Sequence, residues 1–145
     1  MTTGEYISEK ISTFQRNHCY TGYLTCRDSD IQRMWQTEKN RENEKWRAIK
    51  NNDDVLKLID AFESTVSYVE KYVKLGNIED GYRMALALYN AIQGLHKLAK
   101  NIDPHPWNKT EFMPMTTQEV DAIFDRLEAI AARMSEQNAR RAMQD

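Results

Sequence analysis

The stretch VLKLIDAFESTVSYVEKYVKLGN, residues 55–77, decides the fold class. Its large apolar side chains recur at alternating steps of 4 and 3 residues, the spacing of a helix face that packs in a bundle. These side chains are Val55, Ile59, Phe62, Val66, Val69 and Val73. Gly76 follows them, and glycine readily adopts the left-handed conformation that commonly ends a helix. The stretch therefore predicts a long helix with one apolar face.

A second apolar helix is predicted after a connection of only a few residues. Asn77 and Asp80 have the spacing of a helix-capping pair, so the two helices are expected to form an antiparallel hairpin. The second helix carries two neighbouring apolar rows, one of Tyr82, Ala85, Tyr89, Ile92 and Ala99, the other of Met84, Leu88, Ala91, Leu95 and Leu98. A helix that is apolar over so wide an arc contacts neighbours on two sides. We expect it to be the central helix or one side of a homodimer contact.

The N-terminal part predicts two further helices. Thr2 and Glu5 have the spacing of a capping box, and the apolar residues after them indicate a short helix that ends near Arg16. A second helical pattern covers residues 31–49 and ends before a pair of asparagines.

The C-terminal part predicts one more helix. Thr116 and Glu119 repeat the capping-box spacing, and apolar positions recur as far as Met134. Residues 134–145 are polar and are expected to fray. Strand-like alternation is almost missing, so residues 1–145 are predicted to form a single all-α domain. Its architecture is a helical bundle of four main helices plus a short N-terminal helix, with a long proline-containing loop between the last two helices.

The charge balance and the apolar runs narrow the partners and the compartment. With 20 basic and 22 acidic side chains, the formal net charge of −2 favours neither nucleic acid nor an anionic membrane for the molecule as a whole. The longest apolar run, MALALY at 84–89, is far shorter than the roughly 20 residues that span a bilayer. Residues 1–20 lack the apolar stretch of a signal peptide. We therefore expect a cytoplasmic protein with reduced cysteines and no membrane partner.

The sequence offers no organised catalytic or metal-binding motif. Zinc could be bound by His18, Cys19 and Cys26 with His96 or His105, but these residues have none of the usual spacings of zinc ligands. His96 continues an apolar row and is expected to be an imidazole at the edge of the core with a hydrogen-bond partner. The acidic side chains of the last helix, Glu119, Asp121, Asp125 and Glu128, are expected to form a solvated face. These patterns predict no enzyme activity, no cofactor and no metal.

The predicted helix over 31–49 raises the possibility of a nucleic-acid interface. Trp35 and Trp46 are eleven residues apart, about three helical turns, so they point the same way. Lys39 lies between the two tryptophans and Arg47 lies beside Trp46, and together they form a basic strip. In such an arrangement the indole rings can stack on single-stranded bases while the basic side chains attract the phosphates. Alternatively, each tryptophan docks on the bundle and the polar middle of the helix is only solvated.

The loop NIDPHPWNKTEFMPM, residues 101–115, is the strongest candidate for a protein-binding surface. It contains all three prolines of the chain, which reduce the entropy lost when a loop is ordered. Trp107, Phe112, Met113 and Met115 add apolar area, and tryptophan is enriched at interface hot spots. Alternatively, the loop packs these side chains against its own bundle, as a crossover between parallel helices would.

Together these patterns predict a non-enzymatic protein–protein interaction module, an adaptor or inhibitor that acts on a larger assembly. The nucleic-acid interface on residues 31–49 is the alternative function. A homodimer formed through the doubly apolar helix is a further possibility.

Overall fold

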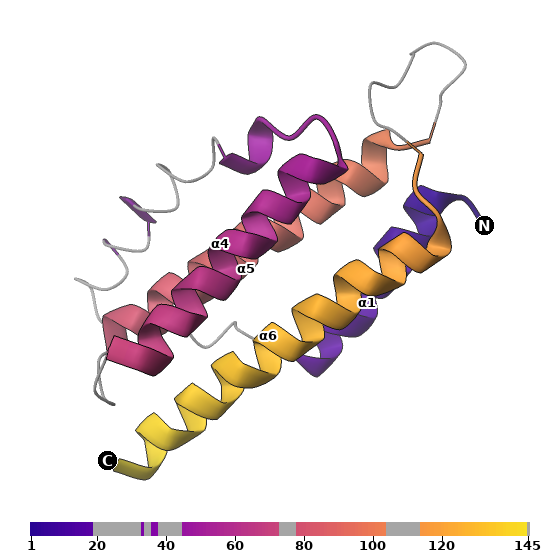
Figure 1. The fold of residues 1–145 in the computed structure, drawn as a ribbon. Coiled ribbons are helices and arrows are strands. Elements are labelled where there is room, and N and C mark those ends of the chain that lie inside the picture. Colours follow the sequence, from indigo (N-terminus) through magenta and orange to yellow (C-terminus); the bar gives the residue numbers. More distant parts are fainter. Residues whose placement is uncertain (19–32, 34–35, 38–44, 73–77, 104–113, 145) are drawn as a thin grey trace.

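In the computed structural model, residues 1–18, 33, 36–37, 45–72, 78–103 and 114–144 are described. Their long helices are α1 (Thr3–Asn17), α4 (Asn52–Tyr72), α5 (Ile78–Asn101) and α6 (Thr117–Gln144) (Figure 1). The described residues contain no strand, so the predicted all-α helical bundle is confirmed. The predicted helix over 31–49 lies largely outside them, although Arg33, Gln36, Thr37 and residues 45–47 are helical.

The four long helices form a bundle in which each contacts two neighbours. α5 packs most extensively on α4 and then on α1, while α6 closes the other side against both α4 and α1. Figure 1 shows α1, α4 and α6 running in one direction and α5 in the opposite one. The predicted antiparallel hairpin of α4 and α5 is therefore confirmed. α5 and α6 occupy opposite corners of the bundle.

This arrangement sets the distance between the ends of the last two helices. Neighbouring helix axes in a bundle lie 8–10 Å apart, so opposite corners are separated by roughly 13 Å. About four extended residues span that distance, so the diagonal placement alone does not account for the long connection between Asn101 and Thr117. The sequence also allows a crossover between parallel helices, but α5 and α6 are antiparallel.

Local hydrogen bonds begin these helices where the sequence predicts. At α1, Thr2 Oγ1 accepts the Glu5 N–H at 3.2 Å, and the Glu5 carboxylate accepts in return from the Thr2 N–H. At α6, Thr116 and Glu119 make the same reciprocal pair, with distances of 3.1 and 3.2 Å. Asn51 accepts the Asp54 N–H at the start of α4. Each box satisfies amide groups that the first turn of a helix leaves without partners.

The core confirms the predicted apolar rows. Val66 of α4 and Ile92 of α5 are both fully buried, and all the other predicted α5 row positions whose side chains are described are buried or partly buried against the core. α1 is short but contributes Ile7, Ile11 and Phe14 to the same core. Both rows of α5 are thus used inside the chain, so they give no support for a homodimer through this helix.

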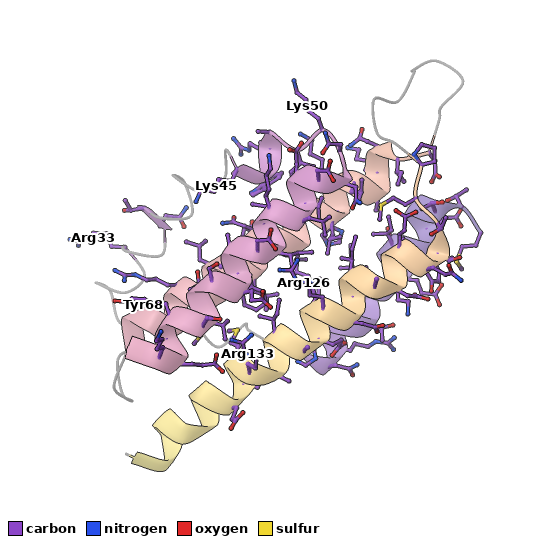
Figure 2. All side chains as sticks on the ribbon, viewed as in Figure 1. Arg33, Lys45, Lys50, Tyr68, Arg126 and Arg133 are labelled. Carbon is purple, nitrogen blue, oxygen red and sulfur yellow. The ribbon has the colours of Figure 1, made fainter. Side chains whose placement is uncertain are left out.

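An ionic ladder joins the parallel helices α4 and α6. Arg126 contacts Asp60 and also Glu63 at 3.2 Å, while Arg133 contacts Glu70 and donates to Ser67 Oγ at 2.8 Å. Figure 2 shows Arg126 and Arg133 between the two helices. These side chains are partly exposed, so each pair contributes at most about 1 kcal/mol. Their main effect is to fix the register of α6 on α4.

The acidic side chains of α6 form contacts that the expected solvated face does not include. Asp121 accepts a hydrogen bond from the Tyr6 hydroxyl and forms an ion pair with Lys10 at 3.2 Å, and both contacts lower the pKa of Asp121. The hydrogen bond to Asp121 raises the pKa of Tyr6. The Glu128 carboxylate contacts Nε2 of His18. Tyr6 and Lys10 of α1, together with His18 just after it, therefore connect this part of the chain to α6. The α-helical pattern could not show this, because the partners are more than a hundred residues away.

The backbone of α6 is helical to Gln144, within the stretch 134–145 that the sequence predicts to fray. Met134 is its last buried apolar residue among those whose side chains are described. This segment contains no glycine or proline and is rich in alanine, arginine and glutamine, which favour helix. Nothing in the segment therefore terminates the helix.

Two buried helical glycines provide a test of this packing. A Cβ atom on Gly4 would lie 2.2 Å from the Ala99 carbonyl oxygen, which belongs to the α5 backbone and cannot rotate away. A Cβ atom on Gly94 would approach most closely the terminal methyl groups of Ile49 and Leu58, which can rotate, and would lie at ordinary contact distance from Val55. We expect Gly4→Ala to lower the free energy of unfolding by about 1–3 kcal/mol. Gly94→Ala should change it by less than about 1 kcal/mol, because higher helix propensity offsets the crowding.

Urea unfolding followed by circular dichroism measures both variants against the wild type. Equal losses in the two variants would contradict the close approach of α1 to the α5 backbone.

Candidate partner-binding site

The proline-containing segment is attached to the core at both of its ends. Ile102, directly after α5, is 4% exposed, and its N–H donates to the Leu98 carbonyl. Met115, directly before α6, is 7% exposed. Both belong to the single core cluster of the described residues. The segment 104–113 therefore starts and ends at fixed points on the same end of the bundle (Figure 1).

A side chain at the first of these points connects to α1. The Asp103 carboxylate accepts the backbone N–H of Gly4 at 2.9 Å. Gly4 lies in the first turn of α1, where amide groups have no partner within the helix and where the helix dipole favours a negative charge. Asp103 thus acts as a second cap of α1, beside the local cap from Thr2.

Of the four predicted protein-binding residues, the structure describes only Met115. Trp107, Phe112 and Met113 lie outside the described residues. Met115 is buried in the core, which corresponds to the alternative reading in which the loop packs on its own bundle. Its side chain anchors α6 and offers almost no accessible surface, so we leave Met115 out of the proposed binding surface.

The predicted nucleic-acid face is described only at its C-terminal end. Trp46 is partly buried against the core cluster, and the Arg47 guanidinium lies 5.5 Å from the centre of its ring. Ile49 is buried, and the Lys97 ammonium contacts the Arg47 carbonyl oxygen. Trp46 therefore docks this end of the segment on the bundle, and its ring is not an open platform for stacking bases. Trp35 and Lys39 lie outside the described residues.

Exposed basic side chains nevertheless gather on the same segment. Arg33, Lys45, Arg47 and Lys50 are all exposed. Figure 2 shows Arg33, Lys45 and Lys50 on the side of the bundle that faces away from α1 and α6. This positive charge is what remains of the predicted nucleic-acid surface in the described part of the chain.

His96 does not occupy the expected position. It was predicted at the edge of the core with a hydrogen-bond partner. It is instead exposed in a shallow groove between the start of α1 and the end of α5, and among the described residues its ring has no hydrogen-bond partner. Partial burial of the ring in the groove lowers its pKa from the usual 6.5. The other groove residues are Thr2, Gly4, Glu5, Ser8, Ala99, Lys100 and Asp103.

The zinc hypothesis finds no support from His18. Its ring stacks on Phe14 with 4.9 Å between ring centres, and its Nε2 is bonded to Glu128. The described residues contain no group of three or more side chains placed to hold a metal ion. Cys19, Cys26 and His105 lie outside them.

Comparisons with known proteins give no information on function. No protein-family model, no curated protein and no solved structure matches it. Within the described residues, no helix has the length and apolar character needed to cross a membrane.

The lowered pKa of His96 predicts a pH dependence of stability. The unfolded chain takes up a proton at His96 near pH 6.5, whereas the folded groove resists it, so stability falls as the pH decreases below about 6.5. His96→Gln should remove this part of the loss. The other charged side chains that line the groove are those of Glu5, Lys100 and Asp103.

Urea midpoints of the wild type and His96→Gln, measured between pH 7.5 and 5.5, test this. The two curves should converge above pH 7 and separate below about 6.5, with the wild type losing more. Parallel curves would show that the folded groove does not disfavour the imidazolium.

Proposed function

We propose that this protein is a non-enzymatic protein–protein interaction module that presents residues 104–113 from one end of a helical bundle. As an adaptor or inhibitor, it would act by binding one component of a larger assembly. The observation that carries the proposal is the attachment of both segment ends to the core through Ile102 and Met115. We further propose the cytoplasm as its compartment, because two cysteines in a chain of this size do not indicate a disulfide framework.

Fixed ends matter because binding must overcome the entropy lost when a segment is ordered. A loop whose ends are held by packed helices explores fewer conformations than a tail or linker of the same length. The two prolines at positions 104 and 106 restrict it further. A segment that is already restricted before the partner binds loses less entropy on binding, so the same contacts give a higher affinity.

The composition of residues 104–113 suits a protein partner. A tryptophan, a phenylalanine and a methionine lie within seven residues, with a lysine and a glutamate between them. Large aromatic side chains dominate the energetics of protein interfaces, and methionine adapts its shape to different surfaces. Trp107 is the side chain from which we expect the largest contribution.

A nucleic-acid-binding function is the second candidate, favoured by the exposed Arg33, Lys45, Arg47 and Lys50. The docked Trp46 weakens it, because part of that ring is already covered by the core. We therefore rank it below the protein-binding function.

The protein-binding function predicts that Trp107→Ala reduces capture of the partner while the thermal midpoint changes by less than about 2 °C, since a surface substitution has little effect on stability. Affinity purification of the tagged protein from its native host, with quantitative mass spectrometry, measures the capture. Loss of one large hot-spot side chain weakens binding by about 2 kcal/mol or more, roughly thirtyfold.

Tyr68→Ala is the matched control, because Tyr68 is the most exposed aromatic of the described helices, at 54%, and lies near the other end of the bundle. It should capture the same proteins as the wild type. A large fall in the thermal midpoint of Trp107→Ala would show instead that Trp107 is a core residue, and equal capture by all three proteins would reject the proposed surface.

The nucleic-acid function predicts binding that falls steeply with salt and is abolished when Lys39 and Arg47 are both replaced by Glu, because each phosphate contact releases a counterion. Fluorescence anisotropy with labelled single-stranded oligonucleotides at 50–300 mM NaCl measures it. No binding at the lowest salt, or a flat response to salt, excludes this candidate.

A further inference from the structure

Residues 45–50, which we call the strap, precede α4 in the chain. They form a single helical turn and a short link beside the start of α4 (Figure 1). Among them only the side chain of Ile49 is buried, at 1% exposed, while that of Trp46 is partly buried. The strap therefore buries little apolar surface, and segments with few buried apolar contacts open most readily.

The strap contacts α5 near Gly94 and Lys97. A Cβ atom on Gly94 would lie 2.5 Å from Cδ1 of Ile49, so the missing side chain of this glycine leaves the space that Ile49 fills. The Lys97 ammonium contacts the Arg47 carbonyl oxygen. In Figure 1 the strap approaches α4 in the direction in which α5 runs, so its helical turn extends from Gly94 toward the earlier residues of α5.

Asn90 lies in that direction, one helical turn before Gly94 on the same face of α5. Its side chain is 4% exposed, and its Oδ1 atom is buried and has no hydrogen-bond partner among the described residues. Water would satisfy this oxygen, so a buried acceptor of this kind destabilises the arrangement that covers it. The burial of Ile49 and the unpaired Asn90 oxygen therefore act on the strap in opposite senses.

We propose that the strap is a detachable cover of α5, which opens and closes over Asn90 while the four long helices stay folded. Closing removes Ile49 from water, and opening supplies Asn90 Oδ1 with the hydrogen bonds that it lacks. Because these two effects oppose each other, the open form is populated far more often than the unfolded chain. The strap thereby controls access to this face of α5, and this control does not depend on residues 104–113.

Cysteine labelling of the full chain tests whether the strap covers Asn90. Asn90→Cys reports on this face, and Ala91→Cys is the matched control, because position 91 is fully buried and points about 100° away around the helix. Modification by iodoacetamide is followed by mass spectrometry of the peptide that contains the new cysteine. We expect Asn90→Cys to react at least about tenfold faster than Ala91→Cys, at a rate that sub-denaturing urea leaves unchanged, because a local opening exposes little surface.

Adding Ile49→Ala to Asn90→Cys should raise the labelling rate at position 90 by about tenfold or more, because the closed strap then loses its buried side chain.

Hydrogen exchange measured by NMR tests the effect of Asn90 itself. The Ile49 amide, which donates to the Trp46 carbonyl, exchanges when the strap opens. Asn90→Leu removes the unpaired acceptor and should slow this exchange about tenfold. Asn90→Asp places a charge that the closed form cannot solvate, and it should speed the exchange about tenfold or more. A change of side-chain shape alone would not act in opposite directions in the two variants.

Equal labelling rates at positions 90 and 91 would overturn the proposal, and so would a rate at position 90 that Ile49→Ala leaves unchanged, because the strap would then not be what covers Asn90. The proposal also fails if Asn90→Leu and Asn90→Asp change the Ile49 exchange in the same direction or not at all. Neither measurement involves partner capture, so these outcomes are independent of the proposed function.

Discussion

The burial of α5 is the constraint on which the other elements depend. α5 has apolar side chains over so wide an arc that one neighbour cannot cover them, and in the structure α4 and α1 cover adjacent sides of it. The chain gains most of its stability from removing this apolar surface from water. Because α4 and α1 enclose α5, α6 lies at the opposite corner and contacts those two helices instead.

The diagonal connection links the fold to the proposed function. A bundle built only of neighbouring hairpins needs short turns, which present little surface. Here the connecting segment is long and contains three prolines and several apolar side chains, and the core holds its ends through Ile102 and Met115. The packing of α5 and α6 therefore sets where the ends of the proposed binding segment lie.

Polar contacts determine how the helices are oriented once the apolar surfaces have met. Apolar packing alone tolerates sliding of one helix along another, whereas the ladder of Arg126 and Arg133 with the carboxylates of α4 specifies one register. Tyr6 and Lys10 with Asp121 do the same between α1 and α6. Asp103 sets α1 against the end of α5. Each contact contributes little energy. Together they favour one arrangement of the helices among several that would bury the same apolar surface.

The sequence by itself determined the helices, their apolar faces and the α4–α5 hairpin, because helical periodicity and capping boxes are local patterns that need no knowledge of the rest of the chain. It also indicated that α5 is central. Only the tertiary structure decided that Met115 is core, that Trp46 docks on the bundle, that His96 faces a groove and that Asp103 caps α1. These features depend on which distant segments become neighbours. The spacing of residues along one helix does not identify the segment that packs against it.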